Sequence, residues 1–514
     1  MVGGAVMTTA STSRWALPVL LVAAFVTTLD FFVANVALPA IRADLGAGES
    51  ATQLVIAGYG LAYAAGVIIA GRLGDIHGPR RIFVIGLALF TLASAACGLA
   101  PDPVFLVSAR VLQGGAAALM APQVLTLLTA LYSGPERARA FGWYGTAVGL
   151  AGVGGQAIGG AVVALDLAGL GWRACFLINV PIGLLALAFV HRLVPDAGRT
   201  AGPGGRSAGR LDVLSAALLA AALVAVVFPL AHGRQAGWPA WAWASLAASV
   251  PLVTAFVARQ RRLEEPLLDL GVFRQRRFVT GLAAVALLFG GSSGLSFVLA
   301  LYLQDGCGLG PLASGAVFTA VNAGFLAASF GARRGAGERL GGRLPFAGAL
   351  ALAAGLLWTF MAVGGAPGAL VPGLLLAGAG MGLVMSPLLS MVLASVRQAH
   401  AGAAAGVLGT VQEVGGVLGV TVVGPVVFGV LDATDWTGAA RAGLAVLVIA
   451  ALAASVLVWR LARTGDAVRD GERPRAPEER PLDRGAPVTA QARGAACRTG
   501  GRTESGAELV EAAR

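Results

Sequence analysis

The sequence is poor in charged residues. Asp, Glu, Lys and Arg make up only 12% of its 514 residues, and Lys is absent altogether. A soluble domain of average composition carries about 25% charged residues, and one buried helix does not account for so large a deficit. The chain is 57% hydrophobic, with a mean hydropathy of +0.79 and 74 Gly. Most of it is therefore expected to lie in lipid, where Gly lets helices pack closely.

Cysteine and histidine, with four residues of each, are also scarce. The Cys show no metal-binding or redox spacing, and the His fall in or near loops without forming a ligand cluster. No loop long enough to hold one contains a nucleotide, metal or nucleophile constellation. We therefore predict that the protein is not an enzyme, holds no metal and needs no cofactor.

Long apolar segments dominate the chain. Roughly 20 such residues cross a bilayer as a helix, and the sequence contains fourteen segments of that kind. This pattern predicts an all-α polytopic membrane protein. The predicted spans are 15–40, 50–71, 81–100, 103–128, 136–164, 173–193, 211–231, 238–258, 278–303, 311–331, 344–364, 369–396, 402–431 and 440–462.

Arg residues are distributed unevenly between the loops that connect these spans. If the N-terminus is cytoplasmic, the inside loops carry 21 Arg before the C-terminal segment, and the outside loops carry only Arg42, Arg173, Arg234 and Arg441. Cytoplasmic loops are rich in positive charge, and a missed span would exchange the two sides. The count predicts a multi-pass protein of the cell membrane with both termini in the cytoplasm. It also explains the basic composition without a nucleic-acid partner.

The spans group into blocks that are separated by polar segments. Two blocks of six spans with two extra spans between them are typical of an internally duplicated transporter. In chain order, we predict a cytoplasmic N-terminus (1–14), a six-helix bundle (15–194), a Gly/Pro/Ser-rich linker (195–210), two inserted helices (211–258), a charged cytoplasmic connection (259–277), a second six-helix bundle (278–463) and a disordered tail (464–514).

Three ionisable residues lie deep within predicted spans. Asp30 interrupts the apolar stretch TTLDFFVANVALP, and Glu413 lies in GTVQEVGGVLG. Arg110 precedes Gln113 by one helical turn. Such groups are costly in hydrocarbon and mark proton or substrate pathways, so we predict proton coupling by Asp30, Arg110 and Glu413. The alternatives are structural: Asp30 as a cap or a fixed partner of Arg110, and Glu413 bonded to Gln412 or to a neighbouring helix.

The sequence contains two glycine-rich motifs, and they predict different structures. GRLGDIHGPRR, at 71–81, is predicted to be a cytoplasmic gating loop with a tight turn, in which Asp75 caps the next helix; an ordinary turn with positive charges is the alternative. Its residues are Gly71, Gly74, Asp75, Gly78, Arg80 and Arg81. GTAVGLAGVGGQAIGG, at 145–160, predicts close helix packing. Its residues are Gly145, Gly149, Gly152, Gly154 or Gly155, Gly159 and Gly160.

These motifs together resemble those of the major facilitator superfamily. GRLGDIHGPRR is similar to the signature loop of that family, and Arg110 with Gln113 is similar to its span 4 motif. LDFFVANVALP, WRACFLINVPIG at 172–183 and EPLLDLGVFRQRRF at 265–278 resemble its fourteen-span drug:proton antiporter branch. The resemblance covers about residues 15–463 and implies the major facilitator fold. The branch usually has a Gly-Pro pair in span 5, where this chain has Gly155-Gln156, and the missing Pro removes a helix-bending element.

The resemblance implies proton-coupled efflux, or antiport, of amphipathic small molecules such as drugs or antibiotics. We expect a monomer in the lipid bilayer that works by alternating access and is powered by the proton gradient. An importer or uniporter of a small metabolite is the alternative, because the span 5 Pro is missing. The predicted cavity residues are polar or aromatic residues within the spans: Phe31, Phe32, Asn35, Gln53, Tyr59, Tyr63, Gln113, Gln123, Trp143, Gln156 and Asn322.

Overall fold

The computed structural model describes residues 9–195, 212–263, 270–331, 343–396 and 401–471, and this part of the chain contains helices and no strand. Its longer helices are α1 (Thr9–Leu45), α2 (Glu49–His77), α3 (Pro79–Gly98), α4 (Pro103–Leu131), α5 (Gly134–Leu165), α7 (Asn179–Leu193), α8 (Val213–His232), α9 (Ala240–Gln260), α10 (Arg276–Leu301), α11 (Pro311–Gly331), α13 (Leu344–Ala362), α14 (Leu370–Ala394), α15 (Ala401–Leu431) and α16 (Trp436–Gly471). The shorter segments are η1 (Leu167–Gly169), η2 (Gly171–Arg173), α6 (Ala174–Leu177), η3 (Leu270–Arg274), η4 (Tyr302–Gly306) and η7 (Pro367–Ala369).

The number of possible membrane spans agrees with the sequence. By length and composition, 12 helices of the described residues are able to cross a membrane, or up to 14 if two bent helices each count as one span. Helix α2 bends by 47° between Val67 and Ile69, and α5 bends by 42° between Gly152 and Gly154. Each predicted span falls on one of these helices, with α6 and α7 forming the sixth. The predicted all-α polytopic fold is confirmed.

The helices form two halves that pack against each other. Helices α1–α7 make up the N-terminal half, in which α4 packs against α2 and α3, and α1 against α5. Helices α10–α16 make up the C-terminal half, in which α14 packs against α11 and α13, and α10 against α15. The main contacts between the halves are those of α5 with α11 and of α2 with α15. These two pairs of helices form the seam between the halves.

The apolar core explains why the halves stay together. One buried cluster lies within the C-terminal half and includes Phe278, Leu299 and Leu444. A second cluster crosses the seam, because it joins Leu38 of α1 to Phe297 of α10 and Phe428 of α15. Burial of large apolar side chains is the main favourable contribution to such an interface once helices are in place.

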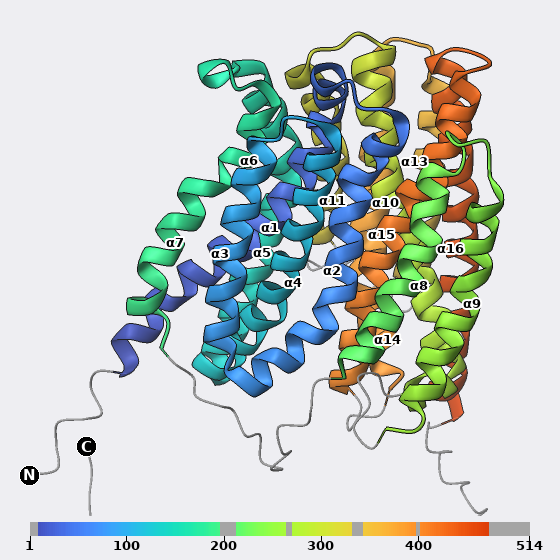
Figure 1. Ribbon diagram of the computed structural model, residues 1–514. Helices are drawn as coiled ribbons and strands as arrows, with labels where there is room; N and C mark the ends of the chain where they lie inside the picture. The colour runs from blue at the N-terminus through green and yellow to red at the C-terminus, as the bar shows by residue number, and fades with distance from the viewer. Residues whose placement is uncertain (1–8, 196–211, 264–269, 332–342, 397–400, 472–514) are drawn as a thin grey trace, which may run out of the picture. The chain divides into compact units, whose positions relative to one another are not determined.

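Helices α8 and α9 form a hairpin between the two halves in the sequence, which we call the inserted hairpin. Helix α8 packs against both α2 and α15, and α9 packs against α8 (Figure 1). Asp212 caps α8 by accepting from Ser215 N at 3.2 Å, and it forms an ion pair with Arg259 of α9 at 2.8 Å. Burial raises the pKa of Asp212, but the hydrogen bonds from Arg259 and Ser215 outweigh that effect and leave the pKa below its ordinary value.

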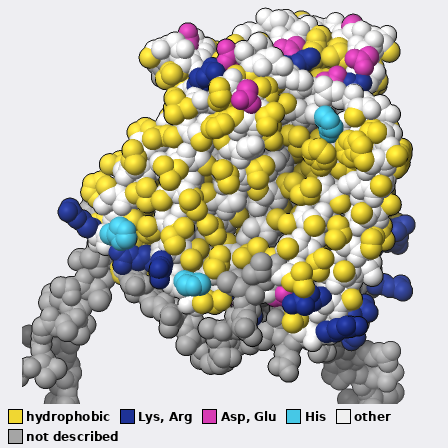
Figure 2. Space-filling view, viewed as in Figure 1, with side chains coloured by type: hydrophobic (Ala, Val, Ile, Leu, Met, Phe, Trp, Pro, Cys, Tyr) yellow, Lys and Arg dark blue, Asp and Glu magenta, His cyan; other side chains and the backbone are white. Residues whose placement is uncertain are grey.

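The surface has the polarity expected of a membrane protein. Hydrophobic side chains cover the middle of the visible face, and charged side chains gather at its two ends (Figure 2). Large apolar side chains of the protein surface are far from buried, with Leu92 67% and Met361 74% exposed. Because isolated water-soluble proteins rarely expose such a continuous apolar band, these faces are suited to contact with lipid.

Two predicted boundaries differ from the structure. Helix α1 begins at Thr9, within the predicted N-terminal segment, and α16 continues to Gly471, beyond the predicted start of the tail at residue 464. Helices extend past the apolar spans because polar residues also adopt helical structure at the ends of a span. Most of the predicted linker (196–210), part of the charged connection (264–269) and the remaining tail (472–514) lie outside the described residues.

Candidate functional site

Asp30 of α1 lies in a closed polar cluster inside the N-terminal half. Its carboxylate forms an ion pair with Arg110 of α4 and accepts from Gln113 Nε2 at 2.8 Å and Asn179 Nδ2 at 2.7 Å. The side chains of Asp30 and Arg110 are both 0% exposed. Hydrogen bonds to charged groups are about twice as strong as neutral ones. Asp30 is therefore locked in a contact between α1, α4 and α7.

Arg110 connects further helices to this cluster. Its Nε donates to the carbonyl oxygen of Val55 in α2 at 3.0 Å, and Gln113 Nε2 donates to Ser94 Oγ of α3 at 2.8 Å. The guanidinium carbon lies 4.3 Å from the centre of the Tyr59 ring, within the range of a cation–π interaction. The sequence predicted Arg110 as the counter-ion of Asp30, and the structure brings these two groups together.

A cavity of about 480 Å³ lies between the two halves. Helices α1, α2 and α5 line one side, and α10, α11, α14 and α15 line the other. Flexible and flat apolar side chains form much of the wall, and both kinds suit ligands of varied shape. They are Phe31, Phe32, Phe289, Phe318, Phe325, Met381 and Met385.

Glu413 of α15 lies in the wall of this cavity. Among the described residues that line the cavity, it is the one with a charged side chain. Its carboxylate makes no hydrogen bond or ion pair with any described residue, including its neighbour Gln412. A carboxylate in such a setting is available to a proton or to a ligand. The alternative of a fixed structural partner for Glu413 is not what the described residues show.

Tyr59 separates the cavity from the Asp30 cluster. One face of its ring lies over Arg110, and the residue also belongs to the cavity wall with Tyr63. The two Tyr rings are stacked with centres 6.4 Å apart. Asp30 itself does not line the cavity, whereas its neighbours Thr27, Thr28 and Phe31 do. The two acids of the predicted proton pathway therefore lie in different environments.

Gln156 of α5 joins the two halves across the cavity. Its Oε1 accepts from Asn322 Nδ2 of α11 at 3.3 Å, and its Nε2 donates to Ser296 Oγ of α10 at 3.4 Å. All three residues line the cavity. These bonds are long, so they are weak and exchangeable with a ligand or with water.

Five of the predicted cavity residues lie elsewhere. Trp143 is 59% exposed on the surface, and the other four are buried within a half or at the seam. Gln113 belongs to the Asp30 cluster, Gln123 Nε2 donates to Ala70 O at 2.7 Å, and Asn35 Nδ2 donates to Phe31 O at 2.8 Å. Gln53 lies against Gly424 of α15. Polar residues in spans thus serve helix contacts as often as they serve the cavity.

The glycines of α5 divide into two groups. A side-chain carbon at Gly155 would lie 2.7 Å from Phe32 Cβ, and one at Gly160 would lie 2.5 Å from the carbonyl oxygen of Pro311 in α11. Gly159 is similarly close to Val33 of α1. In contrast, Gly145 has nothing within 4 Å, and neither has Gly149, which lines the cavity. A further cavity glycine, Gly152, would touch Phe32 only at ordinary van der Waals distance. Close packing therefore applies to the second half of the predicted stripe.

The predicted gating loop at 71–81 is mostly helical. Helix α2 continues to His77 and α3 begins at Pro79, so Gly71, Gly74 and Asp75 lie inside α2. Gly78 alone joins the helices, with φ +92°, a conformation that side chains other than that of Gly rarely adopt.

The side chains of this motif make contacts that the sequence did not predict. Gly74 faces Gln123 Oε1, which would lie 2.0 Å from a Cβ atom. Arg80 Nη2 donates to His191 O at 2.7 Å and so ties α3 to α7, whereas Arg81 and Asp75 are exposed. Asp75 does not cap α3. The N-cap residue of that helix is Gly78, and no side-chain hydrogen bond caps the helix there.

Helix α5 is bent although it lacks the Pro that is usual in span 5 of this branch. Helix α5 bends by 42° between Gly152 and Gly154, immediately before Gln156. Three glycines at 152, 154 and 155 weaken the helix here, because Gly has low helix propensity and adds no side-chain contacts. The argument against export that rested on the missing bend is therefore removed.

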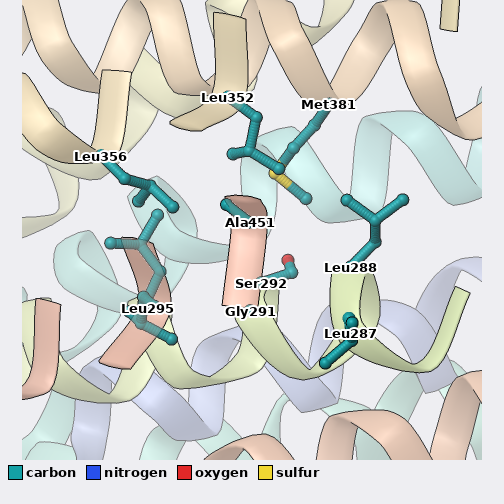
Figure 3. Close-up of a pocket in the computed structure, with 10 residues that line it drawn as sticks. Leu287, Leu288, Gly291, Ser292, Leu295, Leu352, Leu356, Met381 and Ala451 are labelled. Carbon is teal, nitrogen blue, oxygen red and sulfur yellow. The ribbon is translucent and has the colours of Figure 1, made fainter. Parts of the chain in front are cut away.

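A second, much smaller void lies beside the cavity, within the C-terminal half. Its volume is about 10 Å³, and α10, α13, α14 and α16 surround it. Leu352, Leu356 and Met381 point towards Leu288 and Leu295 across it (Figure 3). A space of that size holds about one water molecule, so it is a packing gap and not a ligand site.

Several residues of the site were missed from the sequence. Asn179 of the motif WRACFLINVPIG completes the Asp30 cluster, and Ser292, Ser293 and Ser296 line the cavity. The run GGSSGLS at 290–296 is the signal that could have found the serines, because small hydroxyl residues interrupt an apolar span there. Gln412 also lines the cavity and was predicted only as a partner of Glu413.

Two helical halves around a shared cavity are the architecture of a membrane carrier. The chain belongs to the major facilitator superfamily, whose family model matches residues 20–420. This match confirms the predicted family and, together with relatives that are named as transporters, the prediction of a transporter that is not an enzyme.

Two known proteins with similar sequences are named for the transport or export of an antibiotic. The probable actinorhodin transporter of Streptomyces coelicolor is 40% identical over 428 residues, which cover 81% of this chain and 73% of that protein. The cephamycin export protein CmcT of Amycolatopsis lactamdurans is 35% identical over 422 residues, which cover 80% and 84%. A solved structure of a bacterial homologue of the human lysosomal transporter Spinster shares the fold, with a TM-score of 0.64 at 16% identity over 88% of this chain and 97% of that one.

Proposed function

We propose that this protein exports amphipathic small molecules, antibiotics or drugs, across the cell membrane in exchange for protons. The observation that carries the proposal is Glu413, a carboxylate without a described partner in an aromatic cavity between two halves. Relatives named for the transport of actinorhodin and the export of cephamycin support the substrate class and the direction. The transporter works as a monomer with both termini in the cytoplasm, and the proton gradient is its energy source.

Glu413 is the proton carrier in this proposal. An ionised carboxylate in a cavity of low polarity is unfavourable unless a counter-ion or a hydrogen-bond donor satisfies it. Binding of a proton removes that charge, and departure of the proton restores a site for a substrate that donates hydrogen bonds. Exposure of the cavity first to one side and then to the other makes this exchange directional.

The aromatic wall accounts for the proposed range of substrates. Phe31 and Phe32 make an edge-to-face pair with ring centres 5.4 Å apart, and Met381 and Met385 of α14 line the same cavity. Flat rings supply a large contact area, and the unbranched Met side chain adapts to irregular shapes. Gln156 and Asn322 add exchangeable hydrogen bonds, which orient a substrate without requiring one particular structure.

Asp30 and Arg110 have a supporting task in this proposal. Their ion pair is removed from the cavity by Tyr59, and Asp30 already accepts three hydrogen bonds. The pair fixes α1, α2, α3, α4 and α7 in the N-terminal half, so that this half moves as one body. Their predicted participation in proton coupling stays a prediction.

Transport in inverted membrane vesicles tests the function. We expect wild-type vesicles to take up ethidium or actinorhodin when respiration acidifies their lumen, and to stop when an ionophore collapses the proton gradient. Glu413→Gln should abolish gradient-driven uptake, while Glu413→Asp, which keeps the carboxylate, should retain part of it. Uptake that continues unchanged after collapse of the gradient would contradict proton coupling, and uptake of the same compounds by whole cells would favour import.

A further inference from the structure

The loop between α8 and α9 lies across the seam between the halves. Arg234 of this loop forms one ion pair with Glu49 at the start of α2 and another with Asp432, just after α15, at 2.6 Å. Glu49 belongs to the N-terminal half and Asp432 to the C-terminal half. A single guanidinium in the inserted hairpin therefore bridges the two halves.

Further bonds attach this loop to α2. Ser50 Oγ donates to Gln235 Oε1 at 2.6 Å, and His232 Nδ1 lies 3.0 Å from Ser50 Oγ. The His232 ring stacks on Phe228 and Trp241, which fixes it to both helices of the hairpin. The loop thus has several polar contacts with the N-terminal half. Its one described ion pair with the C-terminal half is that of Arg234 with Asp432.

Two of these three charges suit the helix ends beside which they lie. Glu49 lies in the first turn of α2, where the helix dipole favours an acid, and Arg234 lies near the last turn of α15, where the dipole favours a base. Below them, an apolar contact joins Ala57 of α2, Val227 of α8 and Val417 of α15. The hairpin is therefore packed into the seam and not only attached at its tip.

Other contacts at the same end also join the halves. Arg42 of α1 pairs with Asp305 of η4 at 3.4 Å, and Gln304 Nε2 donates to the Val36 carbonyl oxygen of α1 at 2.9 Å. Acidic and basic side chains lie together at the upper end of the molecule in Figure 2. By contrast, the pair of Arg173 with Asp44, at 2.5 Å, connects residues of the N-terminal half alone. This pair is a natural control.

We propose that the inserted hairpin is a clasp that keeps this end of the transporter closed. The clasp consists of Arg234 with Glu49 and Asp432, and of Gln235 and His232 with Ser50. The proposal rests on the proposed function, because alternating access requires this end to open in each cycle. Arg234 cannot keep both acids when the halves separate, so one of its two ion pairs must break.

The contact with Asp432 is the one that breaks. Its side chain is 65% exposed, whereas that of Glu49 is 23% exposed, and exposed ion pairs contribute less. The bonds to Ser50 keep the loop on α2. The hairpin therefore moves with the N-terminal half when this end opens.

Distances between spin labels test the clasp. Leu99→Cys and Met361→Cys place labels on exposed positions of the N-terminal and C-terminal halves at this end, and Ala244→Cys places one on the hairpin. Cys307 and Cys497 are first replaced by Ser, while Cys97 and Cys175 are buried and can stay. Measurements on purified protein in lipid nanodiscs need neither substrate nor a proton gradient, so their outcome is independent of the proposed transport activity.

We expect Arg234→Gln to raise the open population in the Leu99–Met361 distances about three- to tenfold, as loss of two partly exposed ion pairs allows. The Ala244–Met361 distance should lengthen with it, while Ala244–Leu99 stays constant. Arg173→Gln should leave all three distances unchanged. Asp432→Asn is a second variant that keeps the loop on α2, and it should shift the same population in the same direction.

Other results would overturn the proposal. Equal effects of Arg234→Gln and Arg173→Gln, or no effect of Arg234→Gln and Asp432→Asn, would show that the loop does not control closure. Lengthening of Ala244–Leu99 with a constant Ala244–Met361 distance would show that the hairpin moves with the C-terminal half.

Discussion

Replacement of Asp30 by Asn is expected to destabilise the protein, not to uncouple transport. The variant leaves Arg110 charged at a position that is 0% exposed. Removing one partner of a buried ion pair costs about 3–5 kcal/mol, because the remaining charge has lost its counter-ion. Both carboxylate oxygens of Asp30 accept hydrogen bonds, from Gln113, Asn179 and Arg110. The amide nitrogen of Asn would therefore face at least one donor, at a further cost of roughly 1–3 kcal/mol.

Abundance and thermal unfolding measure this effect directly. We expect Asp30→Asn to lower both the amount of protein in the membrane fraction and the Tm of the purified protein, followed by Trp fluorescence. Addition of Arg110→Met to that variant removes the unpaired charge and should restore part of the loss, with a coupling energy of about 1–3 kcal/mol. The partly exposed ion pair of Asp44 with Arg173 supplies the control, since Asp44→Asn should change the free energy of unfolding by less than about 1 kcal/mol.

One result would refute this reasoning. If Asp30→Asn reached normal abundance and a normal Tm but transported substrate without regard to the proton gradient, Asp30 would be a proton carrier. Its bonds to Arg110, Gln113 and Asn179 would then have to open during the cycle.

Three shorter predictions follow from other parts of the chain. Gly378→Ala should lower the Tm, because the added Cβ would lie 1.8 Å from the Val321 carbonyl oxygen. It would push α11 away from α14 at a cost of roughly 1–3 kcal/mol. Gly145→Ala is the control, because the space around Gly145 is open. Gln156→Ala should change the apparent affinity for ethidium in vesicle uptake by less than about tenfold and leave the Tm unchanged, since only weak bonds are lost. The pKa of Asp212 is lower in the folded protein than its ordinary value, so the ionised carboxylate stabilises the fold above about pH 4, and this contribution is lost as the pH falls. The difference in Tm between wild type and Asp212→Asn should therefore become smaller between about pH 7 and about pH 3.

The spans were predictable because each is a local property of the sequence. A run of about 20 apolar residues is sufficient to identify a helix that can cross a bilayer, and the helices of the structure fall on the fourteen predicted runs. Even the ion pair of Asp30 with Arg110 followed from a simple rule, because a buried charge needs a partner and the spans contained few. The prediction failed where the segment 71–81 continues as helix, since Gly74 packs there against Gln123 of α4 and Asp75 lies on the exposed side of α2.

The direction in which each side chain points was not predictable in the same way. Gln53, Gln123 and Gln156 look alike in the sequence, each an amide in an apolar helix. The structure buries Gln123 against Ala70 O and Gln53 against Gly424, and leaves only Gln156 in the cavity. When nearly every residue of a helix is apolar, the hydrophobic pattern does not distinguish the side that faces lipid from the side that faces protein. Which side faces the cavity depends on the neighbouring helices.

Gln156 shows how a departure from a family pattern can be misunderstood. In the sequence, Gln156 stands where the branch usually has Pro, and the missing Pro is an argument against export. In the structure, glycines bend α5 beside it, and its amide reaches Asn322 and Ser296 across the cavity. A Pro at this position would supply a bend but no side-chain hydrogen bond. The substitution therefore separates two tasks: the glycines take over the bend, and the amide gives the cavity a polar contact that spans both halves.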